Sequence, residues 1–151
     1  MSDTRAVSVP IQYVLLLAIV ALLSGGLYVS VGGFVQDEQA GAAEDALGVI
    51  GARLASDLAA ADRVATPLDG AGTLSIVADT PAHVAGATYT VTVESTGTPD
   101  RAVLVLASQQ PAVSVRQVVV TDVPVGTGSV AGGPLRIVYD ASADRLEVRH
   151  G

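Results

Sequence analysis

Few residues of this chain have the type and spacing that a catalytic or metal site requires. The chain holds two histidines, His83 and His150, and no cysteine. A thiolate zinc site is therefore excluded, and a Ser-His-Asp triad has few possible members. His83 lies in a predicted loop after Pro81-Ala82, and His150 is next to the C-terminal residue. We predict no catalytic residue, no metal site and no cofactor, and we do not expect an enzyme.

Two local motifs resemble binding loops, but each lacks a required feature. Residues 125–133 read VGTGSVAGG, and a proline and a predicted strand follow them, whereas phosphate-binding loops need a helix N-terminus at that point. Asp140, Ser142 and Asp144 alternate like the start of a calcium-binding loop. Arg145 stands where that loop needs glycine. We interpret the first motif as a plain loop and the second as a polar hairpin turn.

The composition excludes several classes of partner and modification. Carboxylates outnumber bases by 15 to eight, which gives a formal charge of -7, and all eight bases are arginine. Nucleic acid is not an expected partner, because phosphate neutralisation needs clustered bases. An acidic surface without lysine suits very salty surroundings, although a GC-rich genome would also favour arginine. The chain has no cysteine for disulfides or lipid attachment and no asparagine for N-glycosylation.

The N-terminal region contains one long apolar stretch. The 31 residues between Arg5 and Asp37 carry no formal charge, and residues 11–31 are almost entirely apolar. About 20 such residues span the hydrocarbon core of a bilayer. A buried core helix is disfavoured, because a domain this small could hardly surround so long an apolar stretch. A removable secretory signal is also disfavoured, because the apolar region of such signals is shorter than the stretch found here. We predict a helix in a membrane or a hydrophobic bundle.

Within this stretch the sequence predicts how the helix begins and how it packs. Ser8 is a predicted N-cap, and Pro10 is tolerated in a first turn. Small residues recur at a spacing of four, which lets apolar helices approach each other closely. The alternative is that the spacing is incidental, since glycine is common in membrane helices. These predicted packing residues are Ala21 with Gly25, and Gly26 with Ser30.

A second helical stretch is predicted after the apolar one. Residues 36–39 are polar and mark the expected membrane exit. From about Ala40 to Val64 the chain is rich in alanine, and Thr66-Pro67 ends the pattern. Apolar residues at spacings of three and four form one stripe that would pack on the rest of the chain or on a partner: Leu47, Ile50, Leu54, Leu58 and Ala61.

Beyond Thr73 the periodicity becomes two, which is typical of strands. The alternation slips near Arg116-Gln117, which predicts a bulge, and residues 140–145 predict a hairpin turn. The predicted fold is therefore α+β: a long hydrophobic helix, an amphipathic helical stretch and a small antiparallel β-domain, either a meander or a sandwich. The predicted strands are 74–78, 88–94, 102–107, 113–120, 135–140 and 145–149.

The residues ahead of the apolar stretch carry a resemblance to a known family. Residues 5–10 read RAVSVP, and this segment resembles the class III signal of archaeal type IV pilins, especially haloarchaeal ones. The resemblance implies that a prepilin peptidase cuts between Ala6 and Val7, with Arg5 as the charged residue of the leader. Haloarchaeal major pilins have a proline one position earlier and a glycine that this chain lacks. These departures favour a minor or pilin-like subunit over a major one.

The resemblance also implies a domain organisation and a function. Residues 1–6 would be the leader peptide, 7–35 the transmembrane and filament-core helix, 36–65 the amphipathic helix, and 73–151 an extracytoplasmic β-domain. We expect a single-pass membrane protein that joins or initiates a cell-surface filament through its helix. The expected partners are the membrane, prepilin peptidase and other pilin-like subunits. The alternative is an anchored extracellular binding or envelope module that does not polymerise.

The cleavage prediction can be tested directly. We expect the mature chain to begin at Val7, so its intact mass should lack the six leader residues. Ala6→Leu or Arg5→Leu should leave full-length protein in the membrane, because the peptidase would lose its recognition residues. Ser2→Ala, which changes the leader away from the cleavage point, should be processed normally. An uncut wild-type chain in its native membrane would contradict the prediction.

Overall fold

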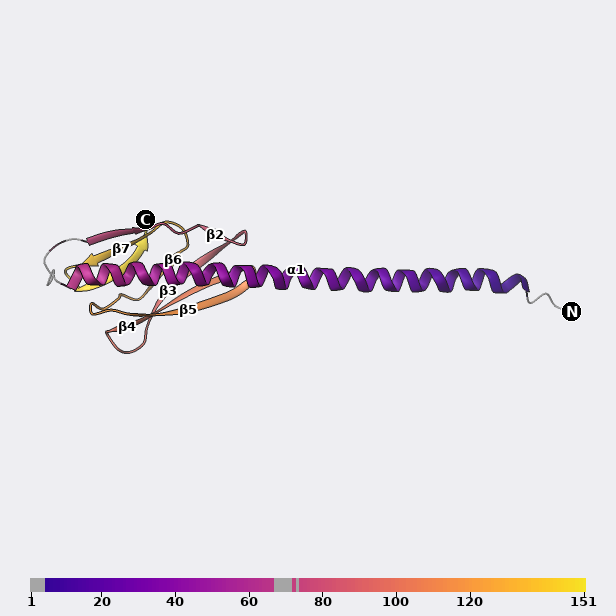
Figure 1. Ribbon diagram of the computed structural model, residues 1–151, viewed down its shortest axis with the longest axis horizontal. Coiled ribbons are helices and arrows are strands. Elements are labelled where there is room, and N and C mark those ends of the chain that lie inside the picture. Colours follow the sequence, from indigo (N-terminus) through magenta and orange to yellow (C-terminus); the bar gives the residue numbers. More distant parts are fainter. Residues whose placement is uncertain (1–4, 67–71, 73) are drawn as a thin grey trace. The chain divides into compact units, whose positions relative to one another are not determined.

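The computed structural model describes residues 5–66, 72 and 74–151, and the side chains of residues 5–10 and 29–33 lie outside this description. It confirms the α+β class. The chain divides into two compact units, Met1–Glu38 and Gln39–Gly151. Within the described residues, one helix, α1, is followed by eight strands (Figure 1). Their bounds are α1 Arg5–Ala65, β1 Leu74–Ala78, β2 His83–Val84, β3 Ala87–Ser95, β4 Arg101–Gln109, β5 Ala112–Val120, β6 Gly128–Ala131, β7 Leu135–Asp140 and β8 Arg145–His150.

The apolar and amphipathic stretches are both helical, as predicted, and they belong to the same helix. α1 contains 61 residues, and neither Gly32-Gly33 nor the polar residues 36–39 interrupt it. Each glycine costs a helix only about 1 kcal/mol relative to alanine, and the flanking residues are good helix formers. The predicted cap at Ser8 is wrong, since the helix already begins at Arg5.

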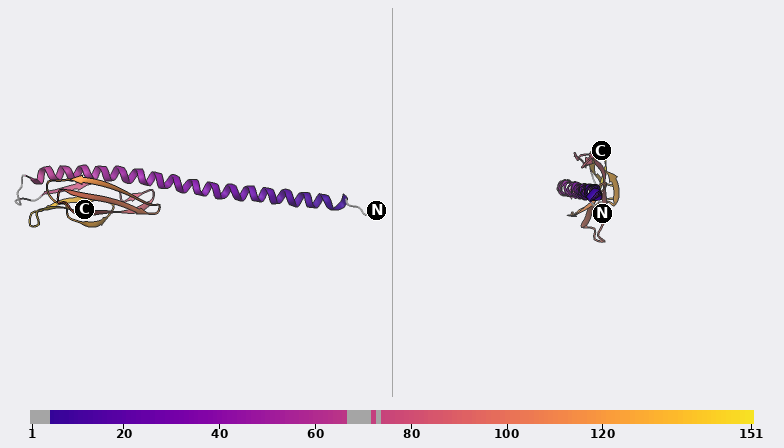
Figure 2. Two further views of the ribbon diagram at one scale, coloured as in Figure 1. Left: turned by 90° about the horizontal axis from the view of Figure 1, so that it is seen from below. Right: turned by 90° about the vertical axis from the view of Figure 1, so that its right-hand side faces the viewer.

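In the second unit, α1 supplies one side of the hydrophobic core. Its buried residues recur every three or four positions, so they form a continuous stripe. The predicted stripe is confirmed and is extended by one turn at each end: Ala43, Leu47, Ile50, Leu54, Leu58, Ala61 and Ala65 are all buried. Both sheets lie on the same side of this part of the helix (Figure 2).

The strands form two antiparallel sheets. One has the order β1-β7-β8, and the other has the order β2-β3-β4-β5 with β6 also paired to β3. In each sheet, one face is buried in the core. On β3, for example, Tyr89, Val91 and Val93 are buried while Thr88 and Thr90 are exposed, which confirms the predicted alternation. The hairpin between β7 and β8 is also confirmed, with Asp140 opposite Arg145.

At Gly51, α1 lies close to the larger sheet. A Cβ atom at this position would lie 3.2 Å from Leu106 Cδ1 on β4 and 3.8 Å from Gln117 Cβ on β5. A residue without a side chain therefore lets the helix backbone lie close to these two strands.

The predicted bulge near Arg116-Gln117 is wrong. β4 and β5 pair without interruption from Arg101 opposite Val120 to Gln109 opposite Ala112. The slip in the sequence pattern has a different cause: Gln117 is a half-buried polar residue on the inner face, under Gly51. Val118 and Val120 alternate with it and are exposed on the outer face, whereas Val119 is buried on the inner face.

Two short strands escaped the sequence analysis. β2 has only two residues, which is too few for a periodic signal. β6 lies within the glycine-rich residues 125–133, which we interpreted as a loop, yet it pairs with β3 from Gly128 opposite Val93 to Ala131 opposite Thr90. The glycine that follows has a steric role, since a Cβ at Gly132 would clash with the ring of Tyr89.

A buried carboxylate joins α1 to the chain that follows β5. Asp62 is 7% exposed, and its Oδ1 accepts a 2.8 Å hydrogen bond from the backbone N–H of Val123. Val123 lies far from Asp62 in the sequence, so only the fold reveals this partner. Buried polar groups are normally paired in this way, because an unpaired donor in the core is costly.

The compactness of the second unit predicts an independent domain. A fragment beginning at Ala40 should be soluble, monomeric and β-rich by circular dichroism, with high salt screening its acidic surface. The helical signal of residues 40–65 should remain. Aggregation in molar salt, or a spectrum dominated by random coil, would contradict an autonomous domain.

The Asp62 contact predicts a second measurable effect in the same fragment. Asp62→Ala leaves the Val123 N–H buried without an acceptor, so it should lower the free energy of unfolding by about 1–3 kcal/mol. Denaturant unfolding followed by circular dichroism measures this change. Asp62→Asn retains an acceptor oxygen and should be milder, and Ser56→Ala on the exposed side of the helix should have little effect. Equal stability of Asp62→Ala and the wild type would exclude a stabilising role for the bond.

Candidate functional site

The most distinctive surface of the first unit is the apolar part of α1. Ile11–Tyr28 has a mean hydropathy of 2.0 over 18 residues, and none of this window is buried within the protein. At a rise of 1.5 Å per residue, these residues extend over about 27 Å, close to the thickness of the hydrocarbon core of a bilayer. α1 is therefore long and apolar enough to cross a membrane.

A shallow apolar depression lies along one side of this segment. Ala18 lies in this depression of about 420 Å³, which Ile11, Val14 and Leu15 also line. At 100° per residue, Ala21 and Gly25 fall on the same face of the helix as Ala18. Two of the predicted packing residues, Ala21 and Gly25, therefore lie on one face with Ala18. The search for small residues four positions apart did not identify Ala18.

The other predicted packing residues lie on a different face. Gly26 is rotated by about 100° from Gly25 around the helix axis, and Ser30 lies one turn beyond Gly26 in helical backbone. The side chain of Ser30 is outside the described part of the structure. A Cβ placed at Gly25 or Gly26 would meet no atom within 4 Å, so larger residues fit there in a single copy of the chain.

The predicted processing residues are at the start of the same helix. Arg5, Ala6 and Val7 are the first three residues of α1, and their side chains lie outside the description. Pro10 follows five positions after Arg5, in the interior of the helix. Because only the first four N–H groups of a helix lack a partner, the missing N–H of Pro10 removes a possible bond to the carbonyl of Ala6.

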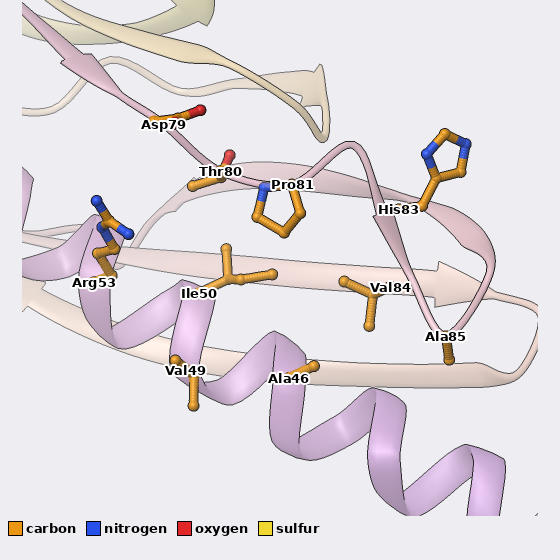
Figure 3. Close-up of a pocket in the computed structure, with 10 residues that line it drawn as sticks. All are labelled: Ala46, Val49, Ile50, Arg53, Asp79, Thr80, Pro81, His83, Val84 and Ala85. Atoms are coloured by element: carbon orange, nitrogen blue, oxygen red, sulfur yellow. The ribbon is translucent and has the colours of Figure 1, made fainter.

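The second unit contains a groove, here named the helix groove, between α1 and the segment that runs from the end of β1 through β2. Its volume is about 470 Å³. Ile50 and Val84 point toward one another across it, whereas the imidazole of His83 points away (Figure 3). Sequence analysis did not find this groove, because the lining comes from separate segments: Ala46, Val49, Ile50 and Arg53 on one side, and Asp79, Thr80, Pro81, His83, Val84 and Ala85 on the other.

The residues weighed as a calcium loop form a hydrogen-bonded turn. Asp140 Oδ1 accepts hydrogen bonds from the Ser142 hydroxyl at 2.6 Å and its N–H at 3.0 Å, and these bonds hold the pKa of Asp140 below its ordinary value. Asp144 accepts a bond from the Tyr139 hydroxyl at 2.6 Å. The motif therefore shapes the hairpin, as the polar-turn interpretation predicted.

Charged side chains elsewhere on the β-domain form local ion pairs. Glu147 accepts hydrogen bonds from Arg149 and Arg145, and these bonds lower its pKa. Glu94 pairs with Arg116 across the outer face of the larger sheet. His83 and His150 are both exposed. Within the ranges that the structure covers, no three His, Cys, Asp or Glu side chains are grouped so that they could hold a metal ion.

Comparison with protein families identifies the family of this chain. The model of a family of unknown function, DUF7266, matches residues 2–150, and the chain therefore belongs to this family. Comparisons with curated proteins and with solved structures gave no match.

Proposed function

We propose that this member of the DUF7266 family is a minor type IV pilin-like subunit. In this proposal the leader is removed after Ala6, α1 anchors the chain in the membrane, and the same helix assembles with other pilin-like subunits. The β-domain lies outside the cell, and no residue acts as a catalyst.

One observation carries the proposal: α1 combines two different surfaces in one helix. From Ile11 to Tyr28 it is apolar on all sides and unburied, whereas from Ala43 to Ala65 only one stripe is apolar and that stripe is buried in the domain core. A subunit that assembles through its helix needs an exposed apolar segment and a domain fixed to the same helix. Both surfaces belong to α1.

The position of Pro10 supports removal of the leader. In a helix that begins at Arg5, Pro10 costs an interior hydrogen bond to the carbonyl of Ala6. In a chain that begins at Val7, Pro10 becomes the fourth residue, where an N–H would have no helical partner in any case. Cleavage at the proposed bond would therefore remove the conflict between the proline and the helix.

The small residues of the apolar segment support assembly through close helix contacts. Lipid offers little hydrophobic drive between helices, so van der Waals packing at small residues has to hold them together. The hollow at Ala18 and the neighbouring Ala21 and Gly25 provide such a surface. The proposed partners are the corresponding helices of other pilin-like subunits.

The test measures assembly separately from insertion. Gly25→Leu combined with Gly26→Ile should leave cleavage and membrane content near wild type, because both changes raise hydrophobicity and neither meets an atom of its own chain. Recovery in sheared filament fractions should fall at least roughly tenfold, because larger side chains keep neighbouring helices apart. Immunoblots of membrane and filament fractions measure both quantities.

Matched variants separate helix contact from general disturbance. Leu22→Ile with Leu23→Ile changes two adjacent residues of the same segment without adding volume, so assembly should persist. Pro10→Ala should have a mild effect, since it changes only the first turn of the mature helix. If the wild type never enters filaments or crosslinks to pilin-like subunits, the protein is an anchored module that does not polymerise. If the double glycine variant assembles normally, glycine packing is not the mechanism.

A further inference from the structure

The larger sheet carries a second pocket, here named the polar pocket, between the β2–β3 hairpin and the end of β4. Its volume is about 490 Å³, within the range of about 300–1,000 Å³ that is typical of small-molecule sites. His83 of β2 lies opposite Thr88 of β3, and its imidazole points away from the helix groove (Figure 3). The polar lining consists of His83, Thr88, Thr90, Gln109 and Gln110.

Strand alternation places this lining on the outer face of the sheet. On β3, Thr90 is exposed while its neighbour Tyr89 is buried in the core. On β4, Ser108 is buried, so the flanking Ala107 and Gln109 face outward. Ala107 lies directly opposite Thr90, and its small side chain leaves room between the polar groups that surround it.

The polar side chains of this lining are not used within the domain. Elsewhere on the same face, polar side chains bond to each other, as the hydroxyls of Thr92 and Ser129 do at 3.1 Å. Among the described residues, none forms a hydrogen bond with a side chain of the polar lining. These side chains supply two hydroxyls, two amides and one imidazole, so hydrogen-bond donors and acceptors face one pocket. They are free to bind a ligand.

The chemical groups of the lining select the class of ligand. No acidic residue and no arginine is among the described residues that line the pocket, so an ionic ligand would find no partner of opposite charge. No Phe, Tyr or Trp ring is among them, so a flat aromatic ligand would find no ring to stack on. An apolar ligand would displace water from five polar groups and replace none of the hydrogen bonds. A sugar fits this lining, because each of its hydroxyls both donates and accepts.

We propose that the polar pocket binds a neutral saccharide unit. The Thr90 hydroxyl and the Gln109 amide bond to its hydroxyl groups from neighbouring strands. His83 from β2 and Gln110 from the turn after β4 add further bonds, and the C–H groups of the sugar lie over Ala107. This inference goes beyond the proposed function, since it concerns the β-domain and does not depend on helix contacts. A free sugar and the terminal sugar of a surface glycan present the same chemistry.

Binding to an array of immobilised oligosaccharides tests the proposal. The full-length chain is placed in lipid nanodiscs, because alkyl-glycoside detergents would themselves offer sugar to the pocket. We expect binding to oligosaccharides that end in neutral hexoses and little binding to counterparts with uronic acid or sulfate, since the acidic domain repels anions. Raising KCl from about 0.5 M to about 3 M should change the affinity less than roughly twofold, because salt screens attraction between charges only.

Three variants locate the binding site on the sheet. Thr90→Val removes a hydroxyl and keeps the shape, so it should raise the Kd about three- to tenfold. Ala107→Leu fills the space between the polar groups and should raise the Kd at least roughly tenfold. Thr92→Val is the matched control, since Thr92 lies on the same face of β3 but outside the pocket, and it should bind like the wild type. Circular dichroism verifies that each variant is folded.

Competition with free sugar identifies the source of the ligand. Displacement of the chain from the array by the matching free disaccharide indicates a soluble sugar. A signal that the free disaccharide does not displace, but that Ala107→Leu abolishes, indicates a longer glycan attached to a surface molecule. Both outcomes support a saccharide site.

Other outcomes overturn the proposal. Absence of binding to every neutral saccharide would do so, as would equal binding by Ala107→Leu and the wild type. A preference for acidic oligosaccharides that weakens with salt would show that the ligand is not neutral. Binding in nanodiscs requires neither cleavage after Ala6 nor entry into filaments. The saccharide site and the pilin assignment can therefore fail independently.

Discussion

Burial of one stripe of α1 is the constraint on which the rest of the domain depends. The aromatic content of the chain is only 3%, so the core has to be built from many small aliphatic contacts. The helix supplies leucines such as Leu47, Leu54 and Leu58, and the sheets supply Leu104, Leu106 and Ile137 from the opposite side. Neither layer could bury its apolar face without the other, because a strand face or a helix stripe needs a partner layer.

This constraint explains which parts of the fold could be predicted from the sequence. Wherever a residue pattern reports burial against the other layer, the prediction succeeded: the helical stripe from Leu47 to Ala61 and the alternation of β3 both follow from periodicity. The strands that were missed, β2 and β6, bury too little to leave a pattern. The bulge was wrongly predicted because the polar Gln117 occupies an inward position. Gln117 lies there against Gly51, which belongs to a distant segment of the sequence.

The candidate sites likewise divide into those that a local sequence pattern predicts and those that only the fold reveals. The apolar segment of α1 is local in sequence, and its length and composition were sufficient to find it. The helix groove and the bond from Val123 to Asp62 join segments that are far apart in the chain, so no local pattern could indicate them. Ala18 is an intermediate case: the small residues were visible, but only the hollow shared with Ile11 and Val14 distinguishes it from other alanines.

The Asp62 carboxylate also determines the axial position of the helix on the sheets. Apolar contacts are non-directional, so they fix this position less strictly than a hydrogen bond does. A shift of α1 by one turn would move Asp62 by about 5.4 Å and leave both the carboxylate and the Val123 N–H buried without partners. The same shift would remove Gly51 from its place against Leu106. A pulling force along the helix axis would therefore have to break a polar and a steric contact together, so the domain resists shear more strongly than aliphatic packing alone would allow.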